Sequence, residues 1–138
     1  MSVDGGLRAL FRAHLPEAFI QSIETGQTGR GIPDLYYIHA GRSGWVECKA
    51  TAAWSVPLET EQVAWLCRHA RAGGRSWVAV RRHHAGGPRK GPPADMLYLI
   101  RGEESPRLKA EGINSLDQHW PGGPSRWPWP AILALLTA

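Results

Sequence analysis

The stretch "GIPDLYYIHAGRSGWVECKA", from Gly31 to Ala50, holds two runs of aromatic and branched residues joined by a glycine-containing link. Such runs are typical of β-strands, and a short "GRSG" connection predicts that they form an antiparallel hairpin. Asp34 begins the first strand, whereas Glu47 and Lys49 lie inside the second. Because a buried charge is costly unless something compensates for it, these side chains are either surface residues or parts of one site.

The alternation of side chains along a strand decides which of these groups can meet. Glu47 and Lys49 project to one face, while Cys48 points to the other and is expected to be a small core residue. In a hairpin, Asp34 lies near Glu47 although thirteen positions separate them in the sequence. Pro33 fixes its own φ and restricts the residue before it, which would aim the chain into the site.

The remaining pattern predicts elements on both sides of this hairpin. Helical spacing marks segments 7–15 and 60–72, and alternating or continuous apolar runs mark strands. The expected elements are a helix over 7–15, strands over 18–26, 34–40 and 44–50, a helix over 60–72, a strand over 76–82, a Gly/Pro-rich loop over 83–95, a strand over 96–102, a short helix within 104–112, an irregular segment over 119–130 and a closing helix over 131–138.

This order predicts an α/β sandwich with strands of mixed direction. The length of 138 residues suits one domain with one core. We expect the core to span about residues 5–102 and residues 103–138 to form a C-terminal extension. No internal repeat is evident.

The composition limits the partners of the chain without identifying one. Sixteen basic and twelve acidic residues give a net charge of +4, which favours a polyanion without requiring it. The sequence has no long uncharged apolar run and no secretory pattern at its start, so we expect no membrane partner. With only two cysteines, Cys48 and Cys67, a reducing cytoplasm is the expected compartment.

The convergence of Asp34, Glu47 and Lys49 has a chemical interpretation. Two neighbouring carboxylates repel unless a cation lies between them, and a hard divalent ion such as Mg²⁺ prefers oxygen ligands. Lys49 could then hold a water molecule or stabilise a phosphoryl oxygen. Metal, water and cation together suit phosphodiester hydrolysis. The pattern alone equally fits a solvated ladder of cross-strand salt bridges.

Three motifs add a resemblance to this interpretation. "GIPD" is followed by "WVECKA" and then by "LETEQVAWL" over 58–66, in which Gln62 opens a helix. This series resembles the PD-(D/E)XK nuclease superfamily, and most closely its VRR-NUC-type branch of small phage and bacterial nucleases, which includes Holliday-junction-resolvase-like enzymes. The resemblance covers about the first eighty residues. It implies a restriction-endonuclease-like α/β/α sandwich with a mixed central sheet.

Carried over by position, the resemblance implies a role for each motif residue. Asp34 and Glu47 would be metal ligands, with the backbone carbonyl of Cys48 as a further ligand. Lys49 would orient the nucleophilic water, and Gln62 would stand at the helix N-terminus beside the scissile phosphate.

Two acidic residues need separate comment. Glu24 matches an upstream acid that many members supply as an additional ligand, although its position varies in the family. Glu59 departs from the family, which often has serine or threonine three positions before the glutamine. Glutamate is a poorer N-cap, but its charge still complements the helix dipole.

The implied protein is a Mg²⁺-dependent nuclease that acts on DNA, with Mn²⁺ expected to substitute for Mg²⁺. The small core favours selection of DNA structure, at junctions, flaps or ends, as in repair and recombination. A homodimer would suit four-way junctions, but the sequence leaves this open. The location would be the cytoplasm of a bacterial or phage-infected cell. Two other interpretations stay open: an inactive or partner-dependent DNA-binding module with the same fold, and a hydrolase of another phosphate.

Basic residues near a flexible loop are candidates for DNA contact, because cations that pair with phosphates release counterions. The candidate residues are Arg30, Arg81, Arg82, Arg89 and Lys90, although a merely solvated loop explains them as well. Neighbouring His83 and His84 lack the ligand spacing of a zinc site. Gln62, Trp65 and His69 share a helix face that would lie over the groove, and "WPWP" over 127–130 is expected to cover the open end of the core.

Overall fold

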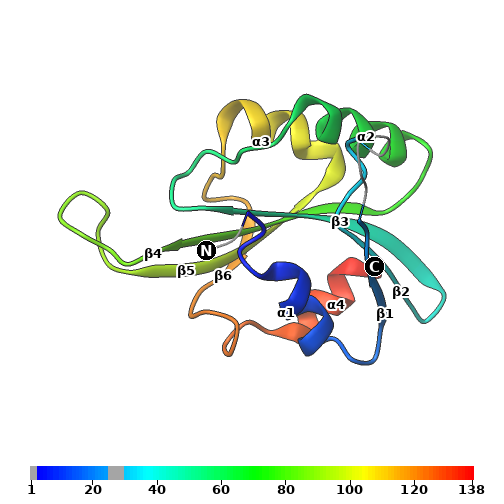
Figure 1. The fold of residues 1–138 in the computed structure, drawn as a ribbon, viewed down its shortest axis with the longest axis horizontal. Helices are drawn as coiled ribbons and strands as arrows, with labels where there is room; N and C mark the ends of the chain where they lie inside the picture. The colour runs from blue at the N-terminus through cyan, green and yellow to red at the C-terminus, as the bar shows by residue number, and fades with distance from the viewer. Residues whose placement is uncertain (1–2, 25–29) are drawn as a thin grey trace.

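The structure, a computed structural model, describes residues 3–24 and 30–138 and consists of a mixed sheet with helices on both faces (Figure 1). The strands follow one another across the sheet in the order β1-β2-β3-β4-β5-β6. The elements are α1 (Leu7–His14), β1 (Phe19–Ser22), β2 (Leu35–His39), β3 (Arg42–Thr51), α2 (Thr60–Arg71), β4 (Ser76–His84), β5 (Ala94–Arg101), the 3₁₀ turn η1 (Gly102–Glu104), α3 (Ser105–Glu111), β6 (Gln118–Trp120) and α4 (Trp129–Leu136).

The predicted β2–β3 hairpin is confirmed. The two strands are antiparallel, with Leu35 opposite Val46 and His39 opposite Arg42. The connection is tighter than the "GRSG" motif indicated, because Arg42 already pairs within the ladder. Ala40 and Gly41 make the turn with φ values of 52° and 77°, a left-handed conformation that glycine adopts without strain.

The mixed strand direction is also confirmed. β3 and β4 run parallel, with Glu47 opposite Val78 and Lys49 opposite Val80. A parallel pair needs a crossover connection, which α2 provides. The other neighbouring strands are antiparallel.

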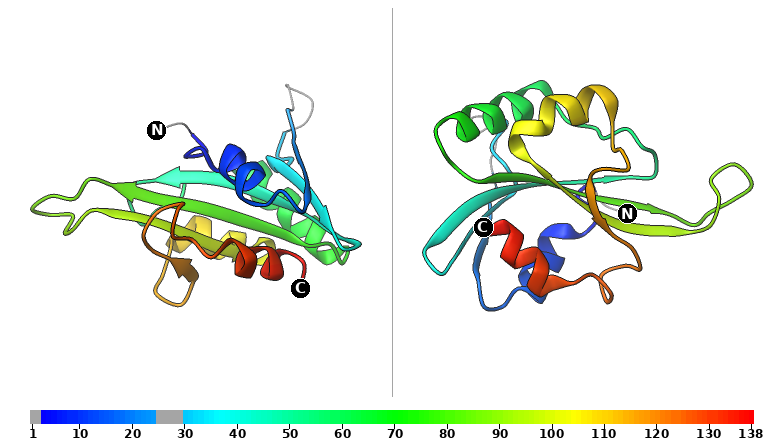
Figure 2. Two further views of the ribbon diagram at one scale, coloured as in Figure 1. Left: turned by 90° about the horizontal axis from the view of Figure 1, so that it is seen from below. Right: turned by 180° about the vertical axis from the view of Figure 1, so that it is seen from behind.

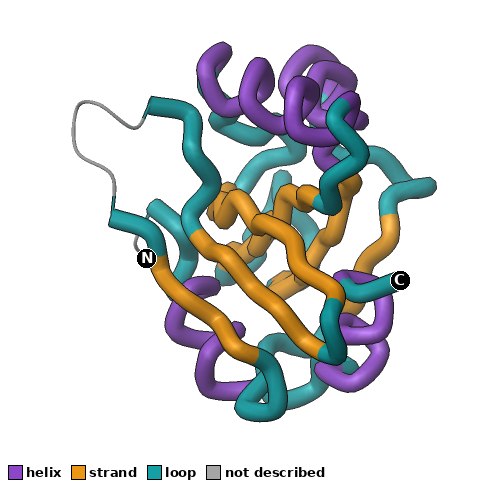
Figure 3. Tube along the Cα trace, turned by 90° about the vertical axis from the view of Figure 1, so that its right-hand side faces the viewer, coloured by secondary structure: helices purple, strands orange, loops and turns teal. Residues whose placement is uncertain are grey.

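Two layers of apolar side chains hold the helices on the sheet, with α1 and α4 below it and α2 and α3 above it in Figures 1 and 3. The lower cluster contains Val46 and Cys48 together with residues of α1 and α4. The upper cluster contains Val78 and Val80 together with Leu66 of α2. Cys48 is therefore the buried core residue that the alternation predicted, whereas Cys67 is only half-buried.

The predicted loop over 83–95 is shorter than expected, since residues 85–93 lie outside the strands but both ends of the segment belong to them. β4 continues to His84 and β5 begins at Ala94, so His83 pairs with Asp95 and His84 with Ala94. The two strands form a long arm that projects from the body of the protein (Figure 2). The glycines and prolines occupy only the tip, where Gly87 bridges to Gly91.

Two further boundaries differ from the predictions. β1 is shorter than expected, and the part of the predicted strand over 25–26 lies outside the described residues. β6, which overlaps the start of the segment expected to be irregular, pairs antiparallel with β5. With three residues it is too short to give a clear alternating pattern.

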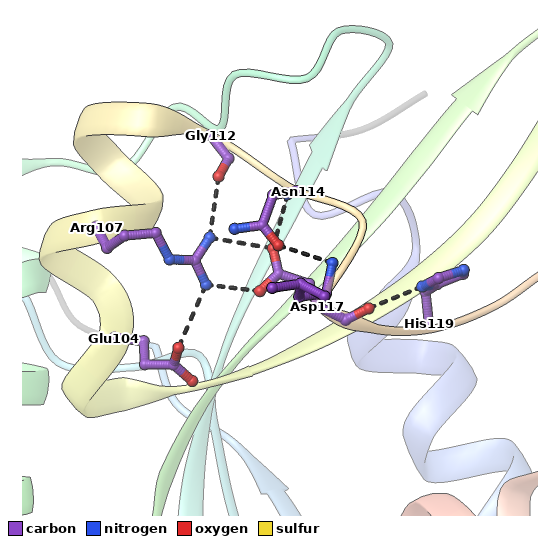
Figure 4. A network of polar contacts seen from close by, with 7 residues as sticks. Glu104, Arg107, Gly112, Asn114, Asp117 and His119 are labelled. Carbon is purple, nitrogen blue, oxygen red and sulfur yellow. Dashed lines mark hydrogen bonds and ion pairs between the residues drawn. The ribbon is translucent and has the colours of Figure 1, made fainter.

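The C-terminal part packs on the rest of the chain. Trp127 and Trp129 are buried in the lower cluster, so "WPWP" covers the core as predicted, and Tyr37 donates a hydrogen bond to the carbonyl of Leu136. In Figure 4, Arg107 of α3 donates two hydrogen bonds to Asp117, of 2.6 and 3.1 Å, and a third to the carbonyl of Gly112. In residues 3–24 and 30–138, no helix is long and apolar enough to cross a membrane.

Candidate active site

The candidate site lies where β2 and β3 part. The β2–β3 pairing ends where Leu35 lies opposite Val46. Because β3 continues to Thr51, the backbone N–H groups of β3 beyond Val46 have no partner in β2. Asp34 uses this opening, since its Oδ2 accepts a 2.8 Å hydrogen bond from the backbone N–H of Cys48. The carboxylate is thereby held beside the strand that carries Glu47.

The "GIPD" turn is shaped by its contact with α2. Gly31 has a φ of +87°, and a Cβ at this position would overlap the carbonyl oxygen of Glu61. Only glycine therefore lets the chain pass so close to the first turn of the helix. The buried Pro33 follows and leads directly to Asp34. The motif thus fixes both the path of the chain and its distance from α2.

Glu47 is the centre of the site and is only 2% exposed. Its Oε1 accepts a 2.7 Å hydrogen bond from Nε2 of Gln62, and Nζ of Lys49 lies 3.8 Å from the same oxygen. Gln62 Oε1 in turn accepts a 2.9 Å bond from the backbone N–H of Glu59, which sets the orientation of its amide. Residues of β3, the first turn of α2 and the turn before β2 therefore meet at one point.

The electrostatics of the site disfavour the ionised form of its two carboxylates. Burial, followed by the nearby Asp34 carboxylate, raises the pKa of Glu47 to about 8, although Lys49 and Arg8 oppose this shift. Burial also raises the pKa of Asp34, against the hydrogen bond from Cys48 and the charge of Arg8. The second carboxylate oxygen of Glu47 is buried without a hydrogen-bond partner. A carboxylate in this state favours a bound proton or a cation.

The donor set fits a hard divalent cation. Mg²⁺ usually binds one or two carboxylates and keeps several waters, and two carboxylates with a neighbouring backbone carbonyl are available here. Within the described part of the chain, no group of three or more His, Cys, Asp and Glu side chains could hold a metal by itself. Asp34 and Glu47, with the carbonyl of Cys48, are the oxygen donors available to such an ion at this site.

Arg8 is a site residue that the sequence interpretation missed. From α1, its guanidinium donates to Asp4 at 3.2 Å and to Ser22 at 3.4 Å. Burial raises the pKa of Asp34 and of Glu47, and the positive charge of Arg8 opposes this rise. Helical spacing alone gave no signal, because Arg8 reaches the site through tertiary packing.

The other two acidic residues discussed from the sequence, Glu24 and Glu59, are both exposed. The Glu24 side chain is 90% exposed and lies 4.0 Å from Arg8, so it forms no three-carboxylate group with Asp34 and Glu47. Glu59 is the N-cap residue of α2 and is exposed. Its contribution to the site is the backbone N–H that orients Gln62.

The basic candidates do not form one patch. Arg81 and Arg82 are adjacent in β4 and therefore point to opposite faces. Arg81 makes two 2.8 Å hydrogen bonds to Asp95 and a third to the carbonyl of Gly5, so its charge is paired within the fold. Arg82 lies on the other face, and Arg89 and Lys90 are exposed at the tip of the arm. Arg30 is exposed next to "GIPD".

Trp65 and His69 of α2 take part in aromatic packing. Their rings stack with centroids 4.7 Å apart, and Trp65 also meets Trp45 edge to face at 5.4 Å. These contacts pack α2 against the start of β3. Of the predicted helix face, only Gln62 reaches Glu47.

Comparison with known proteins found no matching family model and no matching curated protein.

Proposed function

We propose that this protein is a metal-dependent nuclease of the PD-(D/E)XK type that hydrolyses phosphodiester bonds in DNA. The observation that carries the proposal is the convergence of all four motif residues. Glu47 meets Gln62 and Lys49 directly, and Asp34 is held beside it through Cys48. A solvated ladder of salt bridges does not account for a Glu47 that is 2% exposed.

The arrangement of elements also supports this assignment. A mixed sheet, with a parallel β3–β4 pair linked by α2 and helices on both faces, agrees with the α/β/α sandwich that the resemblance implies. We therefore extend the α/β description of the fold to that class as part of the proposal.

Each residue has a part in the proposed reaction. Asp34, Glu47 and the Cys48 carbonyl would hold Mg²⁺, or Mn²⁺ in its place. When bound, such an ion stabilises charge on phosphate oxygens and lowers the pKa of a coordinated water. Gln62 occupies one Glu47 oxygen and leaves the other free for the ion. Lys49, which is 6% exposed with its ammonium group 3.8 Å from Glu47, would orient the attacking water.

The direct test is cleavage of labelled linear duplex, single strand, flap and four-way junction in Mg²⁺, Mn²⁺ or EDTA. The proposal predicts cutting that requires the metal. Binding to DNA without cutting in either metal would instead favour the DNA-binding module. Release of phosphate from nucleotides, with intact DNA, would favour a different phosphate hydrolase.

A further inference from the structure

A second feature includes Arg82, which lies on the same face of the sheet as the candidate site. A groove of about 1000 Å³ opens beside the β4–β5 arm, between the strand pair and the segment that follows β3. Trp54, Arg82 and Tyr98 contribute to its lining, and Arg89 and Lys90 extend it at the tip of the arm. The catalytic residues proposed above do not line it.

The position of the groove relative to Glu47 follows from the strand register. Arg82 is on the same face of β4 as Val78 and Val80, which are the register partners of Glu47 and Lys49. Arg82 itself pairs with Thr51, four residues beyond Glu47 on β3. At roughly 3.3 Å per residue, the groove therefore begins about 13 Å from Glu47 along the sheet.

The charge of the groove suits a polyanion. Its lining includes the cations Arg82, Arg89 and Lys90, whereas its carboxylate, Asp95, is paired with Arg81. His84 also lines the groove, and its Nδ1 accepts a 3.1 Å hydrogen bond from the N–H of Gly86. Partial desolvation and the neighbouring cations Arg82 and Lys90 lower the pKa of His84.

The aromatic part of the groove suits a nucleobase. The Arg82 guanidinium lies over the Trp54 ring at 3.8 Å from its centroid, and its Nε donates to the carbonyl of Ala53. Arg82 is thus held in place, while Trp54 stays 55% exposed despite its large apolar ring. Bases stack on such fixed aromatic platforms in proteins that bind single strands. A base inside a duplex cannot do so, since its neighbours already cover both of its faces.

We propose that this groove binds a single-stranded segment of nucleic acid, with a base stacked on Trp54 and phosphates beside Arg89 and Lys90. The proposal builds on the proposed function and names its substrate class: DNA with an unpaired strand, such as a flap or frayed end, next to the phosphodiester that is cut.

The test is binding in EDTA, which needs no catalysis, of a labelled oligo-dT strand and of a blunt duplex of equal length. Trp54→Ala is expected to weaken binding of the strand about tenfold, as for loss of one stacked base, and Trp54→Phe to restore most of it. The affinity for the duplex should be unchanged by either variant.

The basic residues at the tip of the arm are tested by salt dependence. Arg89→Ala and Lys90→Ala should each reduce the slope of log affinity against log salt concentration, for strand binding, by about 0.7. Arg12→Ala, which removes an exposed cation from α1 on the opposite face, is the matched control and should change nothing.

The outcomes separate the groove from the nuclease assignment. If binding of the single strand depends on Trp54 but the protein cuts no DNA, the proposal for the groove would be supported and the proposed nuclease function would be contradicted. If Trp54→Ala and wild type bind the single strand with equal affinity, the proposal that the groove binds it would be overturned, even if metal-dependent cleavage is found. An equal loss of duplex and strand binding in Trp54→Ala would overturn it as well.

Discussion

The side-chain amide of Gln62 donates a 2.7 Å hydrogen bond to Glu47, and this bond joins the first turn of α2 to the middle of β3. The same amide accepts a hydrogen bond from the Glu59 N–H, so it also caps the helix. One side chain therefore both orders the helix N-terminus and fixes the carboxylate at the centre of the site.

Gln62→Ala should consequently affect activity and stability together. We expect a large loss of metal-dependent cleavage, because Glu47 is no longer held, and a loss of about 1 kcal/mol in the free energy of unfolding, as for removal of a cap. Cleavage rates and urea unfolding measure the two effects. Gln118→Ala, at an exposed position of β6, is the control. Full cleavage activity in Gln62→Ala would show that Gln62 has no role in the site.

Arg8→Ala tests the residue that the sequence interpretation missed. Arg8 lowers the pKa of Asp34 and of Glu47, so removing its charge should raise both values. The rise of the cleavage rate with pH should therefore move to higher pH. Arg12→Ala removes an exposed arginine from the same helix and should leave the profile in place. Identical profiles for wild type and Arg8→Ala would show that Arg8 does not act on these carboxylates.

The raised pKa of Glu47 makes a prediction about stability without metal. The ordinary value is 4.5 and the folded value is about 8, so the folded state holds the proton more tightly. The stabilisation from this proton is fully present below pH 4.5 and is lost as the pH rises through 8. Glu47→Gln, which stays neutral, should therefore be more stable than wild type above pH 8, by an energy on the order of a few kcal/mol.

Chemical unfolding in EDTA at several pH values measures this difference. It should disappear well below pH 4.5, where Glu47 is neutral in both the folded and the unfolded state. A stability difference that is the same at all pH values would mean that the Glu47 carboxylate is not desolvated as the structure indicates.

Asp117→Ala tests how the C-terminal part is held. The substitution removes the two hydrogen bonds from Arg107 and one from the N–H of Asn114. Because Arg107 would lose its closest carboxylate in a partly buried place and keep only the Gly112 carbonyl and the more distant Glu104, we expect a loss of about 2–3 kcal/mol in the free energy of unfolding. Glu111→Ala, at an exposed position of α3, should cost far less. Equal losses in the two variants would contradict this role of the Arg107–Asp117 pair.

Local patterns predicted the hairpin and the centre of the site. Strand alternation placed Glu47 and Lys49 on one face, and the hairpin brought Asp34 to Glu47, because both effects depend on residues close in the sequence. The helix signal around Gln62 was equally local. These are the parts of the structure that neighbouring residues determine.

The parts that escaped prediction depend on distant residues or on ambiguous signals. Arg8 reaches the site only through packing of α1, and the Asp95 partner of Arg81 comes from another strand. The glycines and prolines at the tip of the arm hid the pairing of His83 and His84. The separation of Arg81 from Arg82, however, follows from strand alternation and could have been predicted.

The central claim is that Asp34, Glu47 and Lys49 form a metal-dependent hydrolytic site. Its most direct test is single-turnover DNA cleavage in Mg²⁺ by wild type and Lys49→Ala, with DNA affinity measured in parallel in EDTA. The account predicts that wild type cuts, that EDTA stops it, and that Lys49→Ala binds DNA with nearly unchanged affinity but does not cut. Equal cleavage rates for wild type and a folded Lys49→Ala protein would contradict it.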